Sequence, residues 1–167
     1  MALLPHYVEG HNLLAGKSVL ITAAAGAGIG FAAARKCVEE GCRAITISDI
    51  HEGRTAKSVE ALKALGGTQL VFGRVANVVV EEQVQALVDD AEAQIAALGL
   101  GTEVLKVPTD IADREQCKAL VARTIERFGR IDALVNGAGG NNPKATSGAA
   151  ASFFDLPADA LRWVFDL

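Results

Sequence analysis

The chain has 167 residues, of which 50% are hydrophobic and 5% aromatic, and its formal net charge is −4. This length suits one domain with a mainly aliphatic core, and the acidic balance argues against a nucleic-acid or acidic-membrane partner. No apolar run reaches the roughly 18 residues of a membrane span, and the first residues lack the basic and apolar regions of a signal peptide. We therefore expect a soluble, cytoplasmic protein.

Strand and helix patterns alternate along the chain after an irregular lead-in. Short apolar runs predict strands at 18–23, 43–48, 69–75, 102–107 and 131–135. Apolar residues three and four positions apart predict helices at 29–40, 52–65, 81–98, 113–128 and from 155 onward. Such alternation is typical of a parallel sheet with crossover helices. The sequence thus predicts a single α/β domain, with a three-layer αβα, doubly wound parallel sheet of about five strands.

The first predicted strand leads directly into glycines, in the stretch SVLITAAAGAGIG at 18–30. Gly26, Gly28 and Gly30 permit a tight turn, and a helix is expected from Ile29. A strand–turn–helix of this kind presents free N–H groups and the positive end of a helix to a phosphate, as in Rossmann-like domains. The alternative interpretation is a tight turn that binds no ligand.

Four segments, in order, resemble the short-chain dehydrogenase/reductase family. The stretch TAAAGAGIG resembles the family's TGxxxGxG cofactor loop, with Ala24 at the place of the first glycine. Asp49, after the second predicted strand, resembles the acidic residue that holds the adenosine ribose. Without a cofactor, Asp49 would be an exposed turn residue or a helix cap. The resemblance implies a Rossmann-like domain that binds NAD(P).

The other two segments follow later predicted strands. Asp110-Ile111 resembles the Asp-Val pair that flanks the adenine; the alternative for Asp110 is a cap of the helix that follows it. Asn136-Gly137-Ala138 resembles the family's NNAG motif, with Gly137 replacing the second asparagine; the alternative for Asn136 is a role in holding the strand end. The cofactor-binding residues that the resemblance implies are Gly26, Gly28, Ile29, Gly30, Asp49, Asp110, Ile111, Asn136, Gly137 and Ala138.

The family's catalytic residues, a serine and a Tyr-x-x-x-Lys pair, have no counterpart here. The one tyrosine, Tyr7, precedes the first strand, and His11 stands four residues later. We therefore expect no catalytic residue, no dehydrogenase activity of its own, and a chain truncated before the family's catalytic half. Three cysteines and three histidines, without metal-ligand spacing, predict neither a disulfide nor a metal site.

Two stretches resemble each other: LVFGRVANVVVEEQVQALVDDA (70–91) and VLKVPTDIADREQCKALVARTI (104–125). Either any two strand–helix units look alike, or the unit is duplicated or spliced. Within the family, residues 10–67 resemble actinobacterial reductases and residues 102–167 resemble sugar-acid oxidoreductases of the mannonate type. One strand-three signal too many, from two family branches, suggests a chimeric or engineered chain.

Three functions stay open at this point. The first is a dinucleotide-binding domain without catalysis, for which the carboxylate of Asp49 favours NAD over NADP, although Arg43 and Arg54 leave NADP open. The second is an engineered structural protein that binds no cofactor, and the third is a fragment of a family oxidoreductase. The uncovered edge of the last predicted strand is expected to pair with another copy, giving a homodimer or higher oligomer. The alternative is that the second strand-three unit caps the sheet within one chain.

Overall fold

Three parallel strands form the sheet of the protein: β1 (Ser18–Ile21), β2 (Ala44–Asp49) and β3 (Leu70–Val75), in the order β1-β2-β3. Val19 lies opposite Ile45, and Ile45 lies opposite Val71. The computed structural model describes residues 8–132, 134–137, 143–148 and 152–165. The chain divides into two compact units, Met1–Val104 with the sheet and Leu105–Leu167, and each is described by itself.

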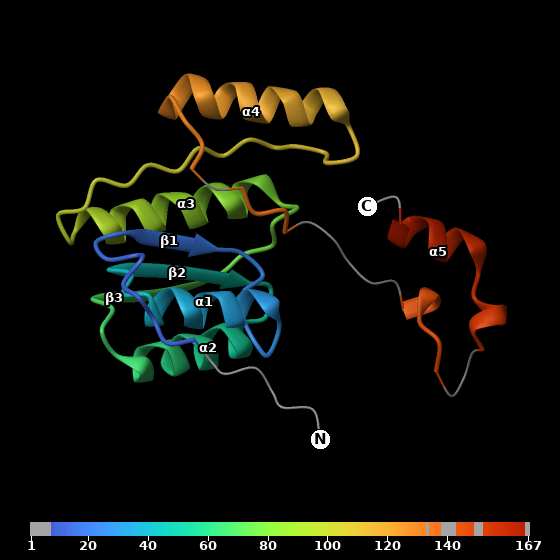
Figure 1. The fold of residues 1–167 in the computed structure, drawn as a ribbon, viewed down its shortest axis with the longest axis horizontal. Helices are drawn as coiled ribbons and strands as arrows, with labels where there is room; N and C mark the ends of the chain where they lie inside the picture. The colour runs from blue at the N-terminus through green and yellow to red at the C-terminus, as the bar shows by residue number, and fades with distance from the viewer. Residues whose placement is uncertain (1–7, 133, 138–142, 149–151, 166–167) are drawn as a thin grey trace. The chain divides into compact units, whose positions relative to one another are not determined.

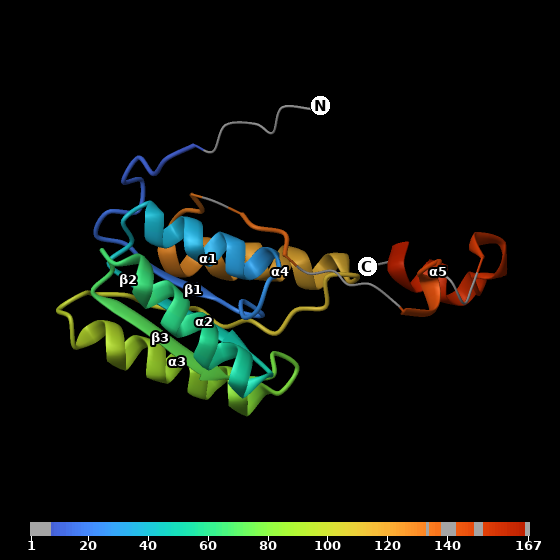
Figure 2. The same cartoon turned by 90° about the horizontal axis from the view of Figure 1, so that it is seen from below.

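Helices cover both faces of the sheet in the first unit. The helices α1 (Ile29–Glu39) and α2 (Glu52–Leu65) lie on one face, and α3 (Glu81–Ala96) lies on the other (Figures 1 and 2). The three layers and the parallel strands confirm the predicted α/β, Rossmann-like fold class. The glycine loop therefore stands where parallel-sheet proteins bind ligands, at the carboxyl end of a strand.

The core lies between β2 and the α1–α2 layer. Ile45 and Ile47 pack in one cluster with Ala34 and Val38 of α1 and with Leu62 of α2. Every residue of β2 is buried. Because side chains alternate along a strand, the intervening hydroxyl residues of β2 point to the opposite face, which α3 covers.

The predicted number of strands is wrong. In the described part of the chain, neither 102–107 nor 131–135 forms a strand, so the sheet has three strands instead of about five. A strand needs a partner with free backbone groups, and the place beside β2 that a strand three would take is already held by Leu70–Val75. Apolar character predicts the tendency to form a strand but does not reveal which of two similar segments will take the place beside β2.

The second unit contains α4 (Arg114–Phe128), two short 3-10 helices at Pro143–Ala145 and Phe153–Asp155, and α5 (Ala158–Phe165). Asp113 caps α4, because its carboxylate accepts the N–H groups of Glu115 and Gln116. Gly129, with φ of +75°, ends the helix. Both ends match the sequence prediction. Among the helices that the structure describes, none is both long and apolar enough to span a membrane.

Glu40 connects the N-terminal lead-in to the end of α1. Its Oε2 accepts the N–H groups of His11 at 2.8 Å and Leu13 at 3.2 Å, and Lys36 Nζ lies 3.3 Å from Oε1. The two backbone donors, together with Lys36, hold the pKa of Glu40 below its ordinary value of 4.5. The charged carboxylate therefore stabilises the folded chain.

We expect acid to lower the thermal unfolding midpoint of the protein. A carboxyl whose pKa is lower in the folded than in the unfolded state contributes stability above its unfolded pKa, and this contribution is lost as the pH falls through the folded value. The loss should begin near pH 4.5, the ordinary value for Glu40. Circular dichroism should show a lower midpoint at pH 7 and a weaker acid dependence for Glu40→Gln. The exposed control Glu60→Gln should keep the original profile, and identical profiles for both variants would contradict this role.

Candidate functional site

The loop between β1 and α1 is held by hydrogen bonds to β2 and α2. The Ala24 N–H donates to the Ser48 carbonyl at 2.9 Å, and the Gly26 N–H donates to Ser58 Oγ at 3.0 Å. Gly26 has φ of +91°, a conformation that L side chains rarely adopt. These bonds fix the loop before any ligand is bound.

Two glycines at the start of α1 have different roles. A Cβ on Gly30 would lie 2.6 Å from the Ala23 carbonyl oxygen and 3.0 Å from Ala24 Cα, so the close approach of helix and loop requires glycine. A Cβ on Gly28 would meet open space, and no described side chain caps the helix there. The start of α1 is thus unobstructed at Gly28 and lacks a side-chain cap, and an uncapped helix start can bind a phosphate.

Asp49 ends β2 beside this loop and is only 8% exposed. Its Oδ1 accepts hydrogen bonds from the His51 N–H and from Arg54 Nη2, both at 3.0 Å. Burial raises the pKa of Asp49, but the His51 N–H, the Arg54 guanidinium and the Ala25 N–H outweigh it and lower the pKa below 3.8. Asp49 is therefore a charged acceptor at neutral pH.

A pocket of about 260 Å³ opens beside Asp49. The residues that line it come from the ends of β2 and β3 and from the glycine loop: Ala23, Asp49, Ile50, Arg54, Ala76 and Val78. An ionised acceptor at a mostly apolar pocket suits a flat, partly apolar ligand with hydroxyl groups. An open helix start and an acidic strand end are the features with which Rossmann-like domains hold the pyrophosphate and the adenosine of a dinucleotide.

Five of the predicted binding residues are brought together here: Gly26, Gly28, Ile29, Gly30 and Asp49. Ile29, the first residue of α1, is 91% exposed. The other predicted residues belong to the second unit. Asn136 and Gly137 lie in an irregular segment that follows no strand in the described residues, and Ala138 lies outside those residues.

Asp110 and Ile111 precede α4. The Asp110 N–H donates to Gln116 Oε1 at 2.9 Å, and Asp110 Oδ1 accepts the Ala112 N–H at 3.0 Å. Asp110 therefore belongs to the turn that leads into α4, whereas Asp113, and not Asp110, is the N-cap of this helix.

Ser58 is a residue of the site that the motifs do not reveal. It is 4% exposed and holds the Gly26 N–H from the inner face of α2. A signal does exist in the sequence, because Thr55, Ser58 and Leu62 have helical spacing and form the buried side of this helix. A hydroxyl on that stripe indicates a buried polar contact.

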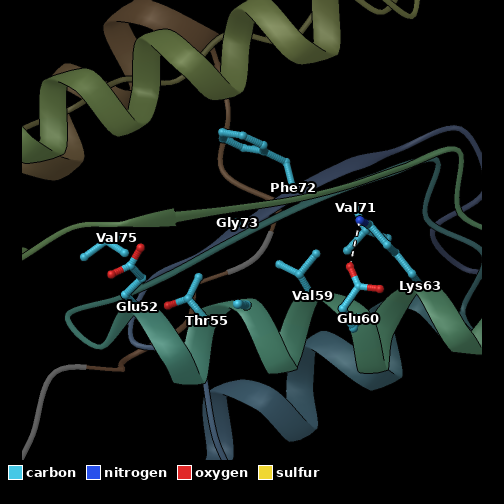
Figure 3. A pocket seen from close by; sticks show the side chains of 10 residues that line it. Glu52, Thr55, Val59, Glu60, Lys63, Val71, Phe72, Gly73 and Val75 are labelled. Carbon is cyan, nitrogen blue, oxygen red and sulfur yellow. Dashed lines mark hydrogen bonds and ion pairs between the residues drawn. The ribbon is translucent and has the colours of Figure 1, made fainter.

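A second pocket, of about 440 Å³, lies between α2 and β3 (Figure 3). Thr55 and Val59 point from α2 toward the strand, whereas Phe72 points to the other side of the sheet. A Cβ on Gly73 would overlap Val59 Cγ2, so the strand comes close to the helix at this point. No residue of the glycine loop lines this pocket. Nowhere in the described residues do three or more His, Cys, Asp or Glu side chains group as metal ligands.

The three layers, the glycine loop and the acidic strand end define a Rossmann-like α/β domain. The sequence profile described as short chain dehydrogenase matches residues 17–100 and 92–156. The chain belongs to the short-chain dehydrogenase/reductase family, whose members bind nicotinamide cofactors.

Two similar proteins support this family assignment. The chain is 36% identical over 147 residues, 87% of its length and 43% of the relative's, to the (5R,7aS)-5-hydroxy-7a-methyl-1-oxo-2,3,5,6,7,7a-hexahydro-1H-indene-carboxyl-CoA reductase of Mycobacterium tuberculosis. It is 32% identical over 130 residues, 76% of its length and 37% of the relative's, to the L-rhamnose 1-dehydrogenase (NAD(P)(+)) of Azotobacter vinelandii.

A solved structure agrees as well. The crystal structure of a short chain dehydrogenase from Mycobacterium smegmatis is 33% identical, with a TM-score of 0.51 over 70% of this chain and 50% of that one. The chain thus spans half or less of the length of each of these three relatives.

Proposed function

We propose that this chain is the nucleotide-binding part of a short-chain dehydrogenase/reductase and that it binds NAD or NADP at the carboxyl ends of β1 and β2. One observation carries the proposal: the start of α1 is open at Gly28, while Asp49 stands charged at the end of the next strand. The loop N–H groups would hold the pyrophosphate, and Asp49 would accept the hydroxyls of the adenosine ribose. Gly26 and Ser58 keep the loop in the shape that this requires.

The activity that we propose for the whole protein is oxidoreduction of a carbonyl or hydroxyl group. The bound nicotinamide would supply or accept the hydride. The names of two relatives, a reductase and a dehydrogenase, support this class of reaction. We assign to this chain the binding and orientation of the cofactor and no catalytic residue. We therefore favour a fragment of a family oxidoreductase over a dinucleotide-binding domain without catalysis.

NAD is expected to bind more tightly than NADP, because the charged Asp49 would repel a 2′-phosphate. Calorimetric titration with NAD⁺ and NADP⁺ tests this order. Asp49→Asn should weaken NAD⁺ binding about tenfold or more, since a hydrogen bond to a charged group is lost, and should narrow the preference over NADP⁺. Glu60→Gln is the matched control, because Glu60 is an exposed carboxylate of α2 that does not line the pocket beside Asp49. Absence of heat with either nucleotide would refute cofactor binding itself.

Two further features belong to the proposal. We infer that the chain combines two family segments, which is supported by two profile matches that overlap at residues 92–100. Within the described residues, β1 and β3 each have one edge without a strand partner, so we also propose a homodimer or higher oligomer. The location that we propose for it is the cytoplasm. Sedimentation at micromolar concentration should then give at least twice the chain mass of 17.3 kDa, and a monomer mass would refute the oligomer.

A further inference from the structure

The turns that lead into α3 and α4 have the same hydrogen bonds. The Asn77 N–H donates to Gln83 Oε1 at 2.8 Å, and the Asp110 N–H donates to Gln116 Oε1 at 2.9 Å. The interval from Asn77 to Asp110 equals that from Gln83 to Gln116. In the first turn, Asn77 Oδ1 accepts the Val79 N–H and the Asn77 carbonyl accepts the Val80 N–H. In the second turn, Asp110 Oδ1 accepts the Ala112 N–H and the Asp110 carbonyl accepts the Asp113 N–H, so the partners are separated by the same interval.

The two helices also carry matching apolar faces. On α3 this face is buried against β3 and β2. On α4, no residue is buried, and Val121 and Phe128 are 49% and 41% exposed. The interval set by the turns aligns the two faces residue by residue. It pairs Val84 with Cys117, Leu87 with Leu120, Val88 with Val121, Ala91 with Thr124 and Ile95 with Phe128.

The segment before α4 is compatible with the position of β3. The Ala76 N–H donates to the Asp49 carbonyl of β2, and the Leu70 N–H donates to the Arg43 carbonyl just before β2. Because N–H groups alternate along a strand, the N–H of Val75 faces the open edge of the sheet. Pro108 corresponds to Val75, and a proline is tolerated on an edge strand where its missing N–H would face outward. Lys106 corresponds to Gly73, where any Cβ requires Val59 to move. This cost explains why the first segment holds the place beside β2.

The sheet face under α3 contains two unsatisfied hydroxyls. Thr46 Oγ1 and Ser48 Oγ are buried and have no hydrogen-bond partner among the described residues. Such groups cost free energy relative to paired ones. Thr124 corresponds to Ala91, which has no exposed surface on α3, so the second segment would bring a hydroxyl to this face.

We propose that residues 104–128 are a second copy of the β3–α3 unit and can replace it on β2 within the same chain. In this exchange, α4 takes the sheet face that α3 covers, and the turn at Asp110 takes the place of the turn at Asn77. The two overlapping family matches are expected for a chain in which one part of the family pattern occurs twice. The proposal does not depend on cofactor binding.

A pair of aspartate substitutions tests the exchange. Leu87→Asp places a charge at a position of α3 that is 1% exposed. Leu120→Asp places a charge at the corresponding position of α4, which is half-buried. Hydrogen exchange should show that Leu87→Asp loses protection in 81–96 and gains it in 114–128, with cooperative unfolding preserved. Leu120→Asp alone should leave the protection of 81–96 and the cooperative unfolding unchanged. The control Gln85→Asp, on the outer side of α3, should give the same result. The double variant should lose cooperative unfolding, because neither copy can then cover the sheet.

The contrary results are equally defined. Leu87→Asp that unfolds as fully as the double variant, or that stays folded without new protection in 114–128, would overturn the exchange. The shift in protection should be the same at tenfold lower protein concentration. If it disappears on dilution, the replacement comes from another copy, and exchange within one chain is wrong.

Discussion

Alanine at Gly30 is expected to destabilise the first unit by about 3 kcal/mol, at the upper end of the range for overpacking. The added Cβ would lie 2.6 Å from the Ala23 carbonyl oxygen and 3.0 Å from Ala24 Cα. Both atoms belong to the backbone of a loop that is tied to β2 and α2, so they cannot move away cheaply. Urea unfolding followed by circular dichroism measures the change.

Gly28→Ala is the matched control for Gly30→Ala. Gly28 has φ of −86°, and its added Cβ would meet open space, so the free energy of unfolding should fall by only about 1 kcal/mol, the cost of alanine in place of glycine at an N-cap. Equal destabilisation by the two variants would show that the contact between loop and helix is not what fixes the loop.

Valine at Gly28 is expected to weaken dinucleotide binding by about a hundredfold or more while the fold persists. The branched side chain would fill the space that the pyrophosphate needs and keep it from the N–H groups at the start of α1. Loss of two charge-assisted hydrogen bonds is enough for this factor. Titration calorimetry with NAD⁺ measures the affinity, and circular dichroism verifies the fold.

Gly53→Val provides the comparison for Gly28→Val. Gly28 is the N-cap of α1, and Gly53 lies in the first turn of α2. A Cβ on Gly53 would likewise meet open space, but this residue does not line the pocket beside Asp49. The affinity of Gly53→Val for NAD⁺ should stay within about twofold of that of the unaltered protein. Unchanged affinity in Gly28→Val would place the nucleotide elsewhere.

The local part of the site could be predicted from the sequence. The glycine loop and Asp49 depend on one strand, one turn and the next strand, and all of these follow from patterns a few residues long. The structure joins them through β1 and β2, which are neighbours in both the sequence and the sheet. Short-range patterns were sufficient because the partners were close along the chain.

The distant part could not be predicted in the same way. Strands at 102–107 and 131–135 were expected from their apolar residues. The place beside β2 that a strand at 102–107 would take is held by Leu70–Val75, and composition does not encode which of two similar segments wins that place. Asp110 fits a family motif, yet the same carboxylate also fits the turn before α4, and the structure uses it there. Ser58 was missed because its role appears only when α2 packs against the loop.

The central claim is that the start of α1 and the end of β2 form a dinucleotide site. Amide chemical-shift mapping during titration of the full chain with NAD⁺ tests it most directly. The account predicts that the largest shifts occur at Gly28, Ile29, Gly30 and Asp49. Shifts that concentrate instead at Thr55, Val59 and Gly73, which line the pocket between α2 and β3, or no shifts at all, would contradict it.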